Sequence, residues 1–127
     1  MKAGDKVYVS GPMSGMPDFN RPMFHEISAH LRSSGFDAVS PPELYAGTDW
    51  HEAMRADLLA LPQCHHIVLL PGWKQSVGAG VELSIALMLE IQAHEAIRHF
   101  DGWQTYPFDK AKCDFYRAAI KGNFPWR

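Results

Sequence analysis

The chain contains little of what defines several large classes of protein. Its two cysteines, Cys64 and Cys113, match no metal-binding spacing, and a chain of 127 residues needs no disulfide. Its net charge of −2 does not favour nucleic acid binding. Its apolar runs are shorter than the roughly 18–20 residues that span a bilayer. The first residues, MKAGDKVYVSG, lack the apolar stretch of a signal peptide. We therefore expect a cytoplasmic protein whose partners include no nucleic acid polymer and no membrane.

Motifs for cofactors and metals are also missing. Residues 11–16, GPMSGM, do not form the GxGxxG pattern of dinucleotide sites, and the seven histidines form no HExxH pattern. Cys64, His65 and His66 are consecutive, and consecutive residues of a strand point to opposite faces, so they do not readily share an ion. We expect neither a cofactor nor a metal.

The remaining composition is that of an ordinary globular protein. Apolar residues make up 46% of the chain and charged residues 20%, and the sequence has no repeat, low-complexity tract or linker. A chain of this length can bury one core. We expect a single domain over residues 1–127.

Strand-like and helix-like segments alternate along this domain. Short buried strands are predicted at residues 6–10, 36–40, 66–70 and, more weakly, 96–100. Helices with apolar residues at helical spacing are predicted at residues 20–34, 49–61, 81–92 and 109–121. This alternation predicts an α/β fold, a Rossmann-like three-layer sandwich with a four- to five-stranded parallel sheet.

Residues at the expected helix ends support these boundaries. Asn20 is a residue type that caps helices, and Gly35 is suited to the left-handed conformation at a helix end. Asp49 and Glu52 have the spacing of a capping box. Ligands of such folds bind at the carboxyl ends of the strands, so the loops after Ser10 and Leu70 should face one crevice.

The stretch SVGAGVE, residues 76–82, is the strongest candidate for a site in this crevice. Gly78 and Gly80 permit close approach of a ligand to the backbone, and a helix start attracts anions. Ser76 adds a hydroxyl, and Glu82 would sit in the first turn of the helix. A tight turn whose carboxylate satisfies the helix start explains the same residues.

Two further residues could join Glu82. Tyr8 lies near the carboxyl end of the first strand, although a packed strand aromatic is the commoner outcome for such a residue. Asp57 could project from the second helix toward the crevice, or it could be an exposed carboxylate paired with a nearby cation. Trp73 and Lys74 border the glycine-rich stretch and could cover a ligand or form an interface.

Taken together, three ordered motifs resemble the nucleoside 2-deoxyribosyltransferase superfamily. They are YVSGPMSG on the first strand, Asp57 before the central strand, and SVGAGVELSIA after it. The superfamily includes the 2′-deoxynucleoside 5′-monophosphate N-glycosidases. A small branch in phages and bacteria, with LPGW and a downstream glutamate, is the most similar part. The resemblance covers roughly residues 6–92.

The resemblance implies a role for each matching position. Glu82 matches the glutamate that attacks the anomeric carbon, Asp57 the aspartate that assists the leaving base, and Tyr8 the tyrosine that orients the glutamate. Ser76 matches the serine that binds the 5′-phosphate, whereas Ser14 stands where those hydrolases have a phosphate-contacting arginine. Further substrate-binding positions are implied in the two loops, at Ser10, Gly11, Pro12, Met13, Gly78, Ala79, Gly80 and Trp73.

The implied activity is hydrolysis of the base–sugar bond of a (2′-deoxy)nucleoside 5′-monophosphate. Base exchange between nucleosides and nucleotide sensing without catalysis remain alternatives. The base, the choice of ribose or 2′-deoxyribose, and the role of residues 101–127 stay open. Superfamily members assemble as homodimers or higher oligomers, which implies the same here, with the Phe124 and Trp126 tail as a candidate contact.

Overall fold

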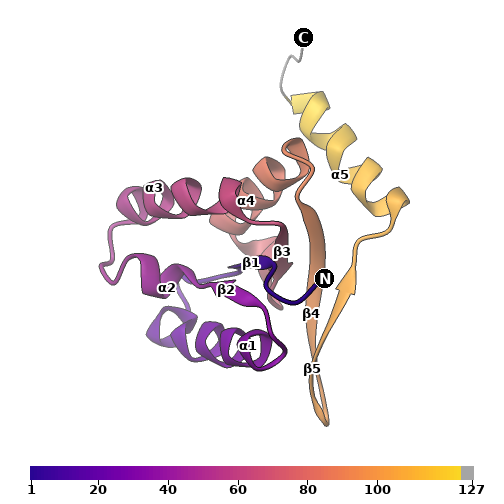
Figure 1. The fold of residues 1–127 in the computed structure, drawn as a ribbon. Coiled ribbons are helices and arrows are strands. Elements are labelled where there is room, and N and C mark those ends of the chain that lie inside the picture. Colours follow the sequence, from indigo (N-terminus) through magenta and orange to yellow (C-terminus); the bar gives the residue numbers. More distant parts are fainter. Residues whose placement is uncertain (124–127) are drawn as a thin grey trace.

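The computed structural model describes residues 1–123 and is built around a five-stranded sheet with the order β2-β1-β3-β4-β5 (Figure 1). Four neighbouring strands are parallel: β2 (Asp37–Val39), β1 (Lys6–Ser10), β3 (His66–Leu69) and β4 (Gln92–His99). The last strand, β5 (Gly102–Pro107), pairs antiparallel with β4. The predicted α/β fold is confirmed, and the antiparallel β5 is an addition to the parallel sheet that we expected.

Helices cover both faces of this sheet. On one side lies α1 (Arg21–Ser33), and on the other lie α3 (Trp50–Ala60), α4 (Val77–Met88) and α5 (Lys110–Asn123) (Figure 1). The connections contain one short helix and three 3₁₀ turns: α2 (Pro41–Leu44), η1 (Pro17–Asn20), η2 (Leu61–Gln63) and η3 (Trp73–Gln75). Within residues 1–123, none of the helices has the length and apolar character needed to cross a bilayer.

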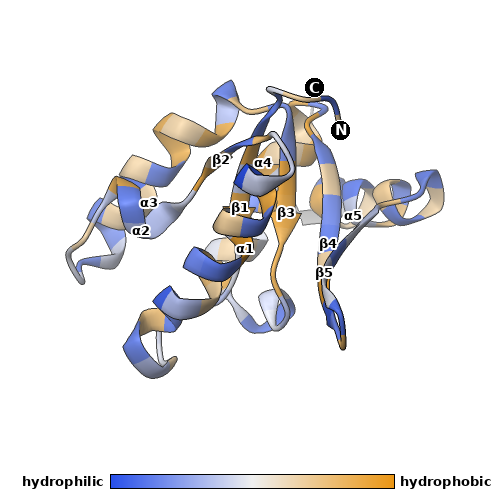
Figure 2. Ribbon diagram, turned by 60° about the horizontal axis from the view of Figure 1, so that its bottom comes forward, coloured by the Kyte–Doolittle hydropathy of each residue, from blue (hydrophilic) through white to orange (hydrophobic). Residues whose placement is uncertain are grey.

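The alternation of side chains along the central strands divides the core in two. Tyr8, Ile67 and Leu69 point toward α4, while Val7 and Val68 point toward α1, and all five are fully buried. Figure 2 shows most of β3 in the hydrophobic colour, which is typical of a strand covered on both faces.

Two predicted boundaries are wrong. The helix expected at residues 81–92 is α4, which begins at Val77 and ends at Met88. Its start is earlier because the Ser76 hydroxyl caps it, and its end is earlier because Glu90 adopts a left-handed conformation with φ +59°. The chain then enters β4 at Gln92, so this strand begins before the expected residue 96.

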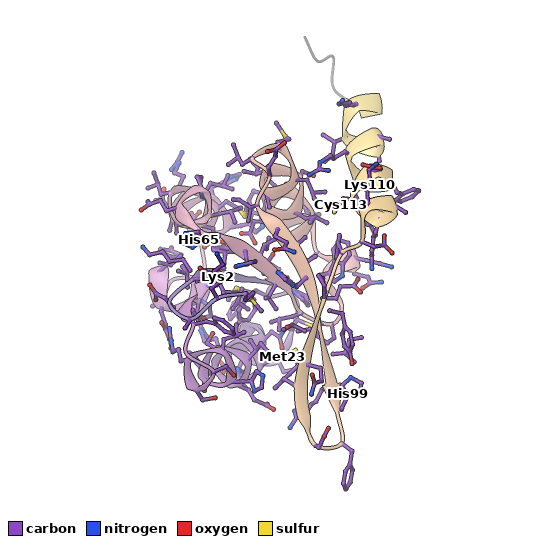
Figure 3. The ribbon with its side chains drawn as sticks, turned by 45° about the vertical axis from the view of Figure 1, so that its right-hand side comes forward. Lys2, Met23, His65, His99, Lys110 and Cys113 are labelled. Atoms are coloured by element: carbon purple, nitrogen blue, oxygen red, sulfur yellow. The ribbon has the colours of Figure 1, made fainter. Side chains whose placement is uncertain are left out.

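The end of the chain also differs from the prediction. Residues 102–107 form β5, which makes a hairpin with β4 whose outer end, near His99, extends away from the helices (Figures 1 and 3). The helix predicted at 109–121 is α5. Phe124 and Trp126 lie outside the described residues, so their predicted role in a subunit contact stays a prediction.

A small buried polar network lies at the amino end of the sheet, opposite the expected crevice. His66 Nε2 lies 2.9 Å from Asp5 Oδ2, and His66 Nδ1 lies 3.0 Å from His94 Nε2. Burial, and then the charge of His66, lower the pKa of His94 to about 4. A neutral His94 is therefore built into the interface between β3 and β4.

Replacing Leu87 by Ala should destabilise the fold by about 2–5 kcal/mol, because its side chain is buried between α4 and the sheet and the change leaves a cavity. The matched control is Leu59→Ala on the exposed face of α3, which should change the free energy of unfolding by less than about 0.5 kcal/mol. Urea denaturation followed by circular dichroism measures both, and equal effects would contradict this packing.

Acid should weaken the fold through His94. Its folded-state pKa of about 4 lies below the ordinary value of 6.5, so the unfolded chain takes up the proton first. The stability that neutral His94 contributes is therefore complete above about pH 6.5 and lost as the pH falls toward 4. Urea denaturation of the wild type at several pH values should show this decrease in the free energy of unfolding. The His94→Gln protein should not show it. The exposed-site control His25→Gln should keep it; an unchanged slope in His94→Gln would be the contrary result.

Candidate functional site

A cleft opens at the carboxyl ends of β1 and β2. One wall is the loop after β1 with the start of α1, including Met13 and Ser14. A second wall is the segment from α2 through α3, and the third is the start of α4. Three acidic residues line it, of which Asp57 and Glu82 are buried and Asp49 is exposed.

Glu82 is fixed at both of its carboxyl oxygens. It lies in the second turn of α4, and its side chain is 4% exposed. The Tyr8 hydroxyl donates to Oε2 at 2.9 Å, and the Ser10 hydroxyl donates to Oε1 at 2.7 Å. Tyr8 and Ser10 are two residues apart on β1, so both point to the face covered by α4. The strand therefore sets the position and orientation of the Glu82 carboxyl group.

Asp57 lies in the last turn of α3 and lines the same cleft. Its side chain is 6% exposed, so the alternative of an exposed helix carboxylate is wrong. Its Oδ1 atom is buried and has no hydrogen-bond partner among the described residues. A buried polar atom without a protein partner is uncommon, and this one lies at the wall of the cleft.

The two carboxyl groups hold protons more tightly than free acids do. Burial, followed by the charge of Asp57 and a hydrogen bond with it, raises the pKa of Glu82 well above its ordinary value. Burial also raises the pKa of Asp57. Two neighbouring acids in such surroundings do not both ionise readily, so the pair retains one proton at pH values where exposed carboxyl groups have lost theirs.

The SVGAGVE stretch is a helix start and not a loop, which corrects the prediction. The Ser76 hydroxyl accepts a hydrogen bond from the Ala79 amide at 3.1 Å, and the Gly80 amide binds the Ser76 carbonyl at 3.0 Å. Gly78 belongs to the first helical turn, where a Cβ atom would lie 3.4 Å from Met54 Sδ. Ser76, Gly78 and Ala79 line the cleft, whereas Gly80 faces a separate hollow beside α5.

Some predicted binding residues have other roles in the structure. Ser10 is fully buried and binds Glu82, and Pro12 is buried, with its carbonyl accepting from Asn20 Nδ2 at 2.9 Å. Asn20 therefore holds the preceding loop and does not cap α1 with its side chain. Trp73 is directed away from the cleft, because it packs between Phe108 and Tyr116 as part of the contact with α5.

The loop after β1 keeps its other predicted residues near the cleft. Gly11, Met13 and Ser14 line it. A Cβ atom at position 11 would lie 2.7 Å from Leu70 Cβ, so only glycine allows the first loop to pass this close to the end of β3.

A strained turn leads from this loop into α1. Asp18, Phe19 and Asn20 have φ values of +51°, +51° and +59°, a left-handed conformation that costs a non-glycine residue about 1 kcal/mol. The turn brings Phe19 and Arg21 to the wall of the cleft. Strain of this kind is often kept where a site depends on it.

A large part of the cleft was not predicted from the sequence. Phe19 before α1, Arg21 at the start of α1, Tyr45 after α2, and Trp50 at the start of α3 all line it. The rule that ligands bind at the carboxyl ends of strands also applies to the loop after β2, where aromatic residues and a glycine cluster. Within residues 1–123, no three His, Cys, Asp or Glu side chains gather closely enough to hold a metal ion.

The chain shares its fold with two solved structures. It superposes on a 2-deoxyribosyltransferase of the bacterium Bacillus psychrosaccharolyticus with a TM-score of 0.55 and 14% identity, over 71% of this chain and 70% of that one. It superposes on BlsM with a TM-score of 0.61 and 19% identity, over 95% and 76% of the two chains. A search of curated protein sequences finds no match.

The fold of this chain is therefore similar to that of a 2-deoxyribosyltransferase. Residues 5–105 match the sequence family described as a domain of unknown function, DUF4406. That match includes the β1 loop, α3 and α4, and therefore every wall of the cleft. The chain is a member of the DUF4406 family.

Proposed function

We propose that the protein is an N-glycosidase that hydrolyses the base–sugar bond of a (2′-deoxy)nucleoside 5′-monophosphate. The observation that carries the proposal is the buried Glu82 carboxyl group, held at both oxygens by Tyr8 and Ser10 beside Asp57. A pair of acids at a cleft is what glycosidic cleavage requires. The fold shared with a 2-deoxyribosyltransferase also supports this reaction class.

The acid pair can perform both halves of the reaction. As the bond between C1′ and the base breaks, its electron pair goes to the base nitrogen, and the proton of the pair passes through Asp57 to the base. Glu82 forms a bond to C1′ and relieves the positive charge on the sugar. Water then attacks C1′ and displaces the Glu82 carboxylate. One proton of the water stays on the new sugar hydroxyl, and the other returns to the acid pair.

The start of α4 is suited to the 5′-phosphate. The first amides of a helix have no partner within it and point outward, where the helix dipole favours an anion. Ser76 and Gly78 lie at this position in the cleft, and the Ser76 hydroxyl hydrogen is still available because its oxygen acts as the acceptor in the cap. This arrangement favours a monophosphate over a nucleoside.

Base exchange is the second candidate, and the fold shared with a 2-deoxyribosyltransferase favours it. It differs only in the acceptor, because a second base and not water would attack C1′. Incubation of a nucleotide or nucleoside with a second free base separates the two reactions by whether a new nucleoside or nucleotide forms. We also propose assembly into a homodimer or higher oligomer, which light scattering tests.

Replacing Glu82 by Gln should lower the rate of base release by about a thousandfold or more, because the amide cannot attack C1′ or stabilise its charge. Chromatography of free bases released from a panel of nucleoside 5′-monophosphates measures the rate. The matched control is Glu90→Gln, an exposed carboxylate beyond the end of α4, which should retain wild-type activity. Full activity of Glu82→Gln would refute the proposal, and tight nucleotide binding without turnover by the wild type would favour a sensing module.

Replacing Asp57 by Asn should slow base release by roughly 10²–10⁴-fold, because the proton donor is lost. In the wild type, kcat/KM should fall as the pH rises through the upper pKa of the pair, where its single proton leaves. Asparagine carries no proton to deliver to the base, so this alkaline limb should disappear in Asp57→Asn, while burial still raises the pKa of Glu82. A pH profile of kcat/KM for both proteins tests the assignment, and an unchanged alkaline limb in Asp57→Asn would contradict it.

A further inference from the structure

Arg21 is the one cationic side chain among the described residues that line the cleft. It is the first residue of α1, and its side chain is 28% exposed. The sequence resemblance gave it no role, and the mechanism above does not use it. It shares the cleft with the two buried acids Asp57 and Glu82.

The guanidinium group is held in a fixed position. Nη1 donates to Asp18 Oδ1 at 3.0 Å, Nη2 donates to the Ala46 carbonyl at 3.3 Å, and the group lies over the Phe19 ring at 5.1 Å. A guanidinium has five N–H donors, and these contacts use two of them. The planar fork therefore keeps donors for a ligand, already oriented at little entropic cost.

The turn at residues 18–20, just before α1, positions the guanidinium group of Arg21. Three consecutive non-glycine residues, 18–20, are left-handed, and Asn20 Nδ2 fastens the turn to the Pro12 carbonyl at 2.9 Å. Asp18 of the turn accepts a hydrogen bond from the guanidinium, and the ring of Phe19 packs against its face. An α-helix can begin without left-handed residues before it, so the strain of residues 18–20 is not required to start α1.

Arg21 and the proposed phosphate position belong to different walls of the cleft. Arg21 begins α1, which covers the Val7 and Val68 face of the sheet, whereas Ser76 caps α4 on the opposite face. The wall around Arg21 also contains Phe19, and Tyr45 lines the neighbouring wall; rings of this kind are suited to a planar base. The wall at Ser76 supplies amides and a hydroxyl, which are suited to phosphate.

We infer that Arg21 is a specificity-determining residue that donates hydrogen bonds to the leaving base. The cleft should therefore prefer bases that present a carbonyl to it, such as thymine and guanine, over adenine. Arginine only donates hydrogen bonds, and it binds guanine O6 and N7 with both arms of its fork. The amino group of adenine is itself a hydrogen-bond donor and would face the N–H donors of Arg21 without an acceptor between them. This inference rests on the proposed function, because it names the substrate class of the same cleft.

Binding in the absence of turnover tests the inference. Titration calorimetry on the Glu82→Gln protein, with and without Arg21→Gln, gives dissociation constants for dTMP, dGMP, dAMP and unphosphorylated thymidine. Loss of Arg21 should weaken dTMP and dGMP on the order of 10- to 100-fold and dAMP by less than about threefold. Thymidine should lose the same factor as dTMP. Arg21→Lys keeps the charge but not the planar fork and should also lose the preference.

The control is Arg55→Gln, an exposed arginine on α3 outside the cleft, which should leave every constant unchanged. Equal losses for all monophosphates with none for thymidine would overturn the inference in favour of a phosphate contact. A preference for dAMP in the parent protein, no effect of Arg21→Gln, or no binding of any nucleotide would also overturn it.

The same panel separates this inference from the proposed function. If the wild type releases no base but Arg21-dependent binding of dTMP and dGMP is found, the proposed hydrolysis fails, while the contact between Arg21 and the base is retained as a binding preference. If the wild type releases base with a preference that Arg21→Gln does not alter, the inference fails alone.

Discussion

The site depends on a carboxyl group that the fold buries and then holds from one strand. Glu82 is almost fully covered, and both of its oxygens accept hydrogen bonds from β1. Burial of an acid is costly unless its atoms are hydrogen-bonded, so the hydroxyl groups of Tyr8 and Ser10 offset part of the cost of burying Glu82. The alternation of β1 points these two residues toward α4 and the intervening Val9 toward α1. The same alternation therefore packs the core and positions the carboxyl group on which the proposed reaction depends.

Much of this could be predicted from the sequence, because it depends on local patterns. Short apolar strands alternating with helices led directly to the α/β fold, and the rule for the carboxyl ends of strands placed the first and third loops at one edge. That Tyr8, Asp57 and Glu82 lie close together was predicted from the order of three motifs in the chain, because the spacing of the residues alone did not indicate it. The hairpin of β4 and β5 was only partly foreseen. Its strands are adjacent in the chain, and Asp101-Gly102 at the turn is a local hairpin signal that the strand predicted at residues 96–100 did not take into account.

Other features required the structure. Ser76 could be read as a ligand residue or a cap, and its bond to the Ala79 amide makes it a cap that can still donate. Trp73 looked like a border of the site, but α5, which comes much later in the chain, covers it. The turn at 18–20 is left-handed without glycine, which sequence preferences argue against, and it is fixed by the contact of Asn20 with Pro12.

The cleft holds its two buried acids together with a helix start suited to phosphate and with aromatic residues suited to a base. The central claim is that Glu82 attacks the sugar carbon. Rapid acid quench of the wild type with a mixture of deoxynucleoside 5′-monophosphates, followed by mass spectrometry of its peptides, tests this directly. We predict a transient adduct of one deoxyribose 5-phosphate on the peptide containing Glu82, whichever base has left. Base release with no adduct, or with the adduct on another residue, would contradict the account.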